Sequence, residues 1–325
     1  MLTSLHIKNF RGFRDLELEP LKRVNLLTGQ NNTGKTGVLE ALALLLDDQT
    51  KGLRGNLPNL FRTAGGDWIE TYWKWLFFNK NQQNNIKIEA VLDDGNPFGM
   101  ILQGAQAPID FHPEKFAPAG DMGGIPCFLT FGKGHAGHKP AIFSTHPNNP
   151  VQDAIDYNRV ILKRRKKEVE GLLRKIEPRL ESVEALQTGQ GQSSTPMIYA
   201  DLGLSEMIPV TQLGQGFSRL LDIYSEIVAA DARVLLIDEI ENGLHYSILP
   251  VIWKGLFLAA KEFDVQIFAT THSWECIMAA DAAARGGENY DLALIRLDRV
   301  AGDIKATVMD DKVLATAKEL KWEMR

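Results

Sequence analysis

The segment GQNNTGKT, residues 29 to 36, contains the residue types that bind phosphate. Gly29 and Gly34 permit backbone conformations that a β-carbon forbids, so successive N–H groups can curve around phosphate oxygens. The Lys35 ammonium adds positive charge near the terminal phosphates, and the Thr36 hydroxyl is a ligand for Mg²⁺. The pattern predicts a site for a nucleotide and its magnesium ion.

Two acidic side chains and one histidine follow other apolar runs, and they are suited to phosphate chemistry. In RVLLIDEIENGLH, residues 233 to 245, Asp238 can hold Mg²⁺ through water. Glu239 comes next and can take a proton from the attacking water as a general base. In VQIFATTHS, residues 265 to 273, the apolar run ends at His272 instead of an acid.

The elements that must position these side chains can be read from the hydrophobic pattern. Residues 24 to 27 and 234 to 237 are continuous apolar runs, as in parallel strands that are covered on both faces. Residues 37 to 45 predict a helix, whose positive N-terminal partial charge faces the anion. A strand and a helix on either side of the loop make a chance match to the loop pattern improbable.

A second glycine-rich turn begins LGQGFSRLLDI, residues 213 to 223, and opens an amphipathic helix. Such a turn is an anion site in its own right, although the chain already has one phosphate loop. A second phosphate-binding helix start makes sense if it serves the γ-phosphate that another subunit holds.

Composition sets the outer limits. A chain of 325 residues with 44% hydrophobic and 24% charged residues can form one large α/β domain or two ordinary ones. No apolar run has the length of a membrane span, and two cysteines, Cys127 and Cys276, provide neither a disulfide framework nor a zinc cluster. We therefore expect a cytoplasmic protein with no membrane partner. A net charge of −5 means that nucleic acid binding would need a local basic patch.

Taken in order, the motifs GQNNTGKT, LGQGFSRLL, LLIDE, ENGLH and TTHS resemble the Walker A, signature, Walker B, D-loop and switch-histidine segments of an ABC-type ATPase head. The start LHIKNFRGF is similar to the SMC, RecF and OLD branch of that class. The asparagine pair and DEIENGLH resemble the OLD-like AAA ATPases of bacterial defence and DNA maintenance. The resemblance implies an α/β P-loop NTPase fold with a mixed-sheet lobe and a helical signature lobe.

The resemblance also implies the site residues and the partners. ATP and Mg²⁺ would be held by the Walker A loop, including Asn31, Asn32 and Thr33, with Arg11 reaching the nucleotide from the first strand. Leu213, Gly214 and Gly216 would complete the ATP site of a second copy, which implies a homodimer through ATP-sandwiched heads. The implied reaction is hydrolysis of ATP to ADP and phosphate, with Lys35, Glu239 and His272 as the catalytic residues.

Some features depart from the family pattern. Gly214 stands where the signature usually has serine, and Ser218 and Arg219, one turn on, could compensate. The Q-loop glutamine has no clear position; Gln103 and Gln106 are the candidates. Because few residues follow TTHS, we expect no Toprim nuclease domain like that of OLD enzymes. We therefore expect the late acids to be ordinary hairpin residues: Asp298, Asp303, Asp310 and Asp311.

We expect one head spanning residues 1–325, with an N-terminal lobe at 1–115 and a C-terminal lobe at 206–325. Between them, residues 116–205 would be an insertion, with a helical segment at 153–187 that Pro178 breaks or kinks. Its basic run KRRKK, Lys163 to Lys167, suits a solvated helix face better than a contact to DNA phosphates or an acidic partner.

Two further stretches allow more than one interpretation. DWIETYWKWLFF, residues 67 to 78, carries three tryptophans, for which core packing is favoured over base stacking. His135 and His138, with His146 nearby, have a metal-like spacing but no matching acids or cysteines. We expect them to lie in a loop near the nucleotide.

Two functions stay open at this stage. In the first, the chain is a working ATPase motor or sensor that acts on DNA or in anti-phage defence. In the second, it is a nucleotide-gated scaffold that assembles or restrains a separate effector protein, with slow hydrolysis. A GTPase is disfavoured because no NKxD motif follows the phosphate loop, and a small-molecule kinase is disfavoured by the signature and the histidine.

Overall fold

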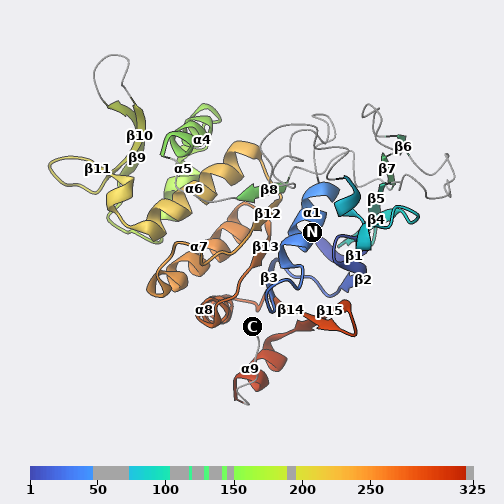
Figure 1. Cartoon of the computed structure of the whole chain (residues 1–325). Helices are drawn as coiled ribbons and strands as arrows, with labels where there is room; N and C mark the ends of the chain where they lie inside the picture. The colour runs from blue at the N-terminus through green and yellow to red at the C-terminus, as the bar shows by residue number, and fades with distance from the viewer. Residues whose placement is uncertain are drawn as a thin grey trace.

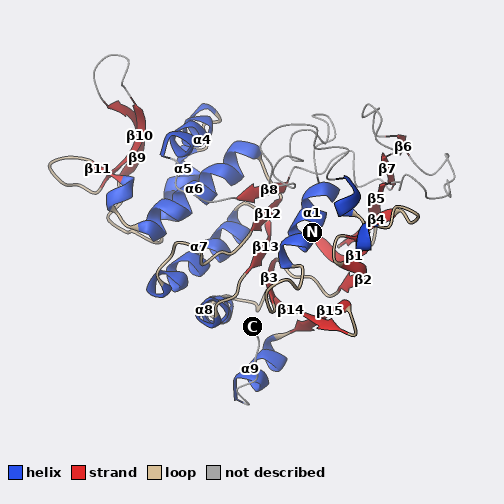
Figure 2. Ribbon diagram, viewed as in Figure 1, coloured by secondary structure: helices blue, strands red, loops and turns tan. Residues whose placement is uncertain are grey.

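The computed structural model describes residues 1–46, 73–102, 117–118, 128–131, 141–144, 150–188 and 195–319. Within these ranges two six-stranded sheets and a smaller three-stranded sheet are joined by helices (Figures 1 and 2). His135, His138, His146, Gln103 and Gln106 lie outside the described residues.

The central sheet carries the motif strands. Its order is β15-β14-β3-β13-β12-β8, and all neighbours are parallel except the β14–β15 hairpin. The strands are β3 (Val24–Thr28), β8 (Ala141–Ser144), β12 (Val234–Ile237), β13 (Gln266–Thr270), β14 (Leu292–Val300) and β15 (Asp303–Met309). Every residue of β3, β12 and β13 is buried, as their apolar runs predict for strands covered on both faces.

The second large sheet is antiparallel and packs with the first helix. Its order is β2-β1-β4-β5-β7-β6. The strands are β1 (Leu2–Phe10), β2 (Phe13–Leu18), β4 (Ile86–Leu92), β5 (Pro97–Leu102), β6 (Ala117–Pro118) and β7 (Phe128–Phe131). Helix α1 (Lys35–Leu45) lies in one hydrophobic cluster with this sheet and with one side of the central sheet.

The other side of the central sheet is covered by helices (Figure 2). They are α4 (Pro150–Leu162), α5 (Lys166–Arg174), α6 (Gln215–Ala230), α7 (Leu249–Glu262) and α8 (Trp274–Arg285). Trp253 of α7 is fully buried among them, and Tyr224 of α6 donates a hydrogen bond to the Gly255 carbonyl at 3.0 Å. In the described part of the chain, none of the helices is both long and apolar enough to cross a membrane.

The small sheet corrects the helical prediction for residues 153–187. Helices α4 and α5 end by Arg174, and residues 182–188 form strand β9 (Ser182–Thr188) instead. Pro178 follows α5 and cannot continue a helix, and β9 then pairs with β10 (Thr195–Asp201), which also pairs with β11 (Ile208–Pro209). The three- and four-residue spacing of the apolar side chains beyond Pro178 was therefore fortuitous.

The segment expected as an insertion also supplies a core strand. Strand β8 pairs in parallel with β12, so Leu235 lies opposite Ile142 at the edge of the central sheet. The sheet that carries the motif strands is thus completed from the middle of the chain.

The basic run from Lys163 to Lys167 is largely occupied by ion pairs. Lys163 and Arg165 both contact the Asp231 carboxylate, at 2.7 and 3.1 Å. Arg165 also pairs with Glu168, and Lys166 pairs with Glu184. This arrangement agrees with a solvated helix face.

The described part of the tryptophan stretch, residues 73 to 78, has both buried and exposed side chains, and residues 67 to 72 lie outside the described residues. It includes the 3₁₀ turns η2 (Trp73–Leu76) and η3 (Phe78–Lys80). Leu76 and Phe77 are buried, as core packing predicts, whereas Trp75 is 50% exposed. The Lys80 ammonium lies 3.6 Å from the centre of the Trp75 ring and covers it.

The C-terminal strands form the hairpin that the sequence predicts, a helix follows it, and the late acids have local structural partners. Asp298 pairs with Arg296 at 3.0 Å, and Asp303 with Arg14 at 3.3 Å. Asp310 caps helix α9 (Asp311–Glu319) by accepting the backbone N–H groups of residues 312 and 313.

Candidate nucleotide-binding site

The loop between β3 and α1 is closely packed on its protein side. Gly29 has φ 135°, and a β-carbon there would lie 2.3 Å from the Leu297 carbonyl oxygen. Gly34 has φ 88°, and a β-carbon there would meet the Phe13 ring at 2.7 Å. Both glycines are therefore required by conformation and by space. The NFRGF segment thus supplies Phe13 as the floor of the loop.

Lys35, the first residue of α1, is 5% exposed and turns back over the loop. Its ammonium donates hydrogen bonds to the carbonyl oxygens of Gly29, at 2.7 Å, and Gln30, at 3.0 Å. Burial lowers the pKa of Lys35, and the negative charges of Asp238, Glu239 and Glu241 oppose that shift. These three carboxylates thus favour the charged form of the amine.

The rest of the loop is held by local bonds. Thr33 is buried, and its hydroxyl donates to the Gln30 carbonyl at 2.9 Å. Asn31 is exposed, and Asn32 has a left-handed backbone with φ 65°. The Asn32 carbonyl accepts a hydrogen bond from Arg299 of the C-terminal hairpin at 3.2 Å. Arg299 therefore braces the loop, a contact that the sequence pattern does not reveal.

The ends of three parallel strands converge beside Thr36. The Thr36 hydroxyl lies 3.0 and 3.2 Å from the two carboxylate oxygens of Asp238, which follows β12. The Thr270 hydroxyl, at the end of β13, donates to Asp238 at 2.6 Å and accepts the Glu239 backbone N–H at 2.8 Å. Thr270 thus bridges the two acids. Its only sequence signal is its place at the end of a strand, as the first residue of TTHS.

Glu239 and His272 follow neighbouring strands at this same edge of the sheet. Glu239 is exposed and has a left-handed backbone with φ 47°, a conformation that costs energy for a residue with a side chain. His272 is half-buried, and its backbone N–H donates to the Glu241 carboxylate at 2.7 Å. Glu241 is a second site residue that the sequence alone did not single out.

Arg11 lies in the turn between β1 and β2, with φ 49°. Its guanidinium is 2.6 Å from the carboxylate of Glu40, a buried residue of α1. Its backbone N–H bonds to the Leu76 carbonyl at 2.6 Å. Arg11 is therefore tied to the helix that begins at the phosphate loop.

The signature residues lie apart from this group. Leu213 and Gly214 precede α6, whose first residues are Gln215 and the buried Gly216. Figure 1 shows this end of α6 beside β11, well away from the start of α1. Gly214 is exposed and has φ 93°, so the first N–H groups of α6 have no side-chain cap.

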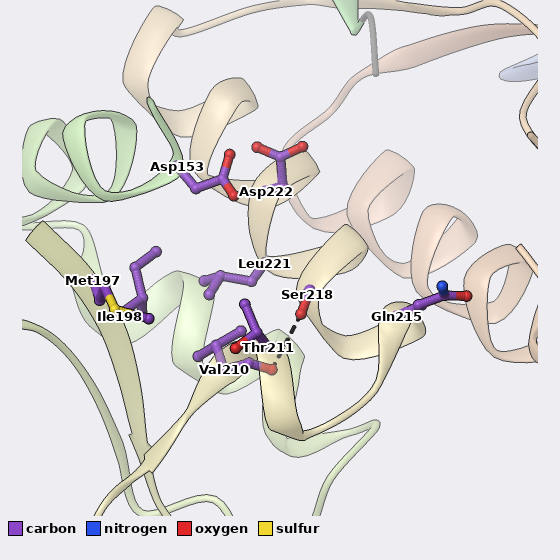
Figure 3. A pocket seen from close by; sticks show the side chains of 9 residues that line it. All are labelled: Asp153, Met197, Ile198, Val210, Thr211, Gln215, Ser218, Leu221 and Asp222. Carbon is purple, nitrogen blue, oxygen red and sulfur yellow. Dashed lines mark hydrogen bonds between the residues drawn. The ribbon is translucent and has the colours of Figure 1, made fainter. Parts of the chain in front are cut away.

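The proposed compensation for the missing signature serine is wrong for Arg219. This residue is 4% exposed and lies 3.4 Å from Asp222 on the same helix. It points into the protein and cannot reach a second subunit without losing that environment. The Ser218 hydroxyl donates to the Val210 carbonyl at 3.1 Å, so it holds η7 (Val210–Gln212) against α6 (Figure 3).

A small pocket of about 70 Å³ lies behind the signature turn and holds a pair of acids. Figure 3 shows the Asp153 carboxyl, from α4, beside that of Asp222, from α6. Burial and the adjacent Asp222 raise the pKa of Asp153 to about 7, and burial also raises the pKa of Asp222. The two acids therefore share a proton below neutral pH.

This pair predicts a pH-dependent stability. Because the folded pKa of Asp153 is above its unfolded value, its contribution is complete below about pH 4 and is lost as the pH rises through 7. We expect this pair to lower the melting temperature by about 1 to 2 °C between pH 5 and pH 8. That shift corresponds to a loss of about 1 kcal/mol in the free energy of unfolding after solvent screening. Asp153→Asn should remove that fall in thermal unfolding scans.

Glu206→Gln, at an exposed residue of the same lobe, is the matched control and should keep the wild-type slope. If Asp153→Asn also keeps the wild-type slope, the two acids do not share a proton.

The described residues fit a magnesium–nucleotide group at the phosphate loop. The loop glycines have positive φ values, a backbone conformation in which successive N–H groups can face phosphate oxygens, and the Lys35 ammonium lies over the same loop. A hydroxyl and a carboxylate, from Thr36 and Asp238, are hard oxygen ligands of the kind that Mg²⁺ prefers. The signature turn is the one group of predicted site residues that the fold places elsewhere.

Comparisons with known proteins agree with this geometry. Residues 4–103 match a model described as an AAA domain, and residues 133–277 match one described as "AAA domain, putative AbiEii toxin, Type IV TA system". The chain is 23% identical to an ATP/GTP phosphatase of Helicobacter pylori, over 88% of this chain and 89% of that protein. It is 52% identical to the DNA replication and repair protein RecF of Nitrosococcus oceani, over 14% of this chain and 12% of RecF.

Solved structures share the fold. An SMC head bound to the C-terminal winged-helix domain of ScpA covers 97% of this chain, with a TM-score of 0.58 and 12% identity. An SMC head with an extended coiled coil, bound to the C-terminal domain of ScpA derived from Pyrococcus furiosus, covers 98% of it, with a TM-score of 0.55 and 11% identity.

Together the fold and the motif strands define a P-loop ATPase head of the SMC type. The chain is similar to the SMC/RecF-like class of ABC ATPases, and its matches to AAA domains and to an ATP/GTP phosphatase support ATP hydrolysis.

Proposed function

We propose that this ATPase holds Mg-ATP in the loop from Gly29 to Thr36 and hydrolyses it at the edge where β3, β12 and β13 end. Lys35 would neutralise the terminal phosphates, and Thr36 and Asp238 would hold Mg²⁺, the Lewis acid of the reaction. Glu239 would take the proton of the attacking water, and His272 would stabilise the γ-phosphate.

The observation that carries this proposal is the contact between Thr36 and Asp238. These residues are 202 positions apart in the chain, yet their side chains lie 3.0 Å apart at the mouth of the loop. The Thr270 hydroxyl bonds to the Asp238 carboxylate and to the Glu239 backbone N–H, so one side chain would position both the proposed metal ligand and the proposed base. Rigid placement of this kind keeps the reorganisation needed for reaction small.

Arg11 and the loop side chains have supporting roles in the proposal. Arg11 would contact the nucleotide from the β1–β2 turn, while Glu40 holds its guanidinium beside α1. Asn31 and Asn32 would offer backbone N–H groups to phosphate oxygens, and Thr33 would keep the loop closed against Gln30.

The test is nucleotide affinity and turnover of the purified chain with ATP and Mg²⁺, beside Lys35→Ala. We expect wild-type hydrolysis of ATP and a loss of affinity of about 10-fold or more in Lys35→Ala, because one charge close to the phosphates is removed. Lys254→Ala, at an exposed lysine of α7, is the control and should bind as wild type does. Wild-type affinity in Lys35→Ala would contradict the proposed site.

We also propose that ATP joins two copies of the chain. The start of α6 lies apart from the start of α1 (Figure 1). The signature residues Leu213, Gly214 and Gly216, which surround the start of α6, would therefore complete the site of a second copy. The exposed, uncapped start of α6 supports this, because free N–H groups at a helix N-terminus attract phosphate.

The output of the cycle would pass to another molecule. We propose an OLD-like role in anti-phage defence or DNA maintenance, in the cytoplasm, through a separate effector protein or bound nucleic acid. The alternative role, a nucleotide-gated scaffold that restrains an effector, is favoured by the family description that names a putative toxin of a toxin–antitoxin system. DNA-stimulated turnover would support the first role, and an effector that copurifies while turnover is slow would support the second.

A further inference from the structure

The carboxylate of Glu241 joins two of the loops at the candidate site. Glu241 lies two residues after Glu239, in the turn that follows β12. Its Oε1 atom accepts the backbone N–H of His272 at 2.7 Å, across the gap between the ends of β12 and β13. The β12–β13 ladder ends at Ile237 and Ala269, and one further backbone bond, from the Ile240 N–H to the Thr270 carbonyl at 3.1 Å, joins the two segments. The Glu241 carboxylate extends this connection to residue 272.

His272 depends on this contact more than its two neighbours do. The Thr271 backbone N–H bonds to the Leu27 carbonyl of β3 at 3.0 Å. Ser273 caps α8, since its hydroxyl accepts the Cys276 N–H at 3.1 Å. Between these two residues, the His272 backbone N–H is held by the Glu241 side chain, which comes from the loop after β12.

The second oxygen of Glu241 marks the residue as unusual. Oε2 is buried and has no hydrogen-bond partner among the described residues. A buried acceptor without a partner costs about 1 to 3 kcal/mol, so such groups are rare unless they serve another purpose. Leucine has similar volume and would avoid this cost, but it could not hold the His272 N–H.

The turn that carries Glu241 is itself well ordered by backbone bonds. The Asn242 N–H bonds to the Glu239 carbonyl at 2.8 Å, and the Leu244 N–H bonds to the Glu241 carbonyl at 3.0 Å. A displacement of this turn would therefore carry the Glu241 carboxylate with it.

We propose that Glu241 is a positioning residue for hydrolysis: it sets the place of His272 through the His272 backbone N–H and transmits movement of the 239–244 turn to that histidine. This inference rests on the proposed function. It assigns Glu241 no contact with the nucleotide, so its effect should appear in turnover and not in binding.

The first test compares two substitutions of Glu241. Glu241→Gln retains an oxygen that can accept the His272 N–H, whereas Glu241→Leu has similar bulk and no acceptor. We expect Glu241→Leu to lower kcat by about 10- to 100-fold with ATP affinity unchanged, because misplacing one catalytic group has effects of that order. Glu241→Gln should stay within about 3-fold of wild type. Glu262→Leu, at an exposed glutamate of α7, is the matched control for the loss of a carboxylate.

The second test is a double-mutant cycle with His272→Ala. If Glu241 acts through His272, then Glu241→Leu should cost nothing further in the His272→Ala protein. A full additional loss, or equal losses in Glu241→Gln and Glu241→Leu, would overturn the inference. So would a loss of ATP affinity, since Glu241 would then act on binding.

These outcomes can be separated from failure of the proposed function. If Lys35→Ala binds and hydrolyses ATP as wild type does, the site itself is misassigned. If Lys35→Ala and His272→Ala are impaired while Glu241→Leu retains wild-type turnover, the site stands and only the role of Glu241 is wrong.

Discussion

Replacing Glu239 by glutamine is expected to lower kcat for ATP by about 10²- to 10⁴-fold, the usual cost of removing a positioned general base. ATP affinity should stay close to wild type, because Lys35, Thr36 and Asp238 keep their positions. The substitution is also structurally mild. Glu239 is exposed, and its backbone N–H, which the Thr270 hydroxyl accepts, is unchanged by the new side chain.

The measurement is steady-state turnover together with nucleotide affinity from an equilibrium titration. Glu262→Gln provides the same chemical change at an exposed position away from the site and should leave both values unchanged. Hydrolysis at the wild-type rate in Glu239→Gln would show that another group activates the water.

ATP with Mg²⁺ is expected to convert the Glu239→Gln protein from monomer to dimer, a doubling of mass by light scattering. Hydrolysis would normally reopen the pair, so the slow variant should retain it. The α6 N-terminus would then face the γ-phosphate of the other copy, where its free N–H groups stabilise negative charge.

The structure indicates which substitution at the start of α6 can prevent dimerisation without disturbing the fold of the monomer. A side chain at Gly216 would meet Ile248 at 2.6 Å within the same copy, so Gly216→Arg would disturb the monomer. Gln215 is exposed at the first position of α6, where an acid is favourable for the helix. Gln215→Glu should therefore fold well yet repel the phosphate of a second copy.

We expect Gln215→Glu, made in the Glu239→Gln background, to bind ATP as a monomer and to stay monomeric. Gln212→Glu, an exposed residue just before the turn, adds the same charge and should still allow the dimer. An unchanged mass in the Glu239→Gln protein, with no dimer present beforehand, would contradict ATP-driven association.

The phosphate loop is the part of the candidate site that could be predicted most fully from the sequence. Its chemistry lies within eight consecutive residues, and the apolar runs on both sides are long enough to predict β3 and α1. The strands β12 and β13 were predicted for the same reason, since a strand buried on both faces needs an unbroken apolar run. These features are local, and a local pattern suffices for them.

The prediction of secondary structure failed where a local pattern is compatible with both a helix and a strand. Residues 182–188 have apolar side chains at spacings that suit a helix, but they form β9 because β10 is available to pair with them. The formation of a strand depends on its partner, and the partner here begins after a further segment of chain. Arg219 was misassigned for a related reason: its position on α6 was correct, but only packing decides which face of that helix is buried.

The sequence by itself determined the class of site: the loop glycines, Lys35, Thr36, the two acids after β12 and the histidine after β13. Only the tertiary structure decided how they meet. The parallel register that sets Ile237 opposite Ala269 places Thr270 beside Asp238, and Glu241 beside the His272 backbone. These bonds join residues 31 or 32 positions apart. Their existence depends on which strands become neighbours in the sheet, and burial of the whole core decides that.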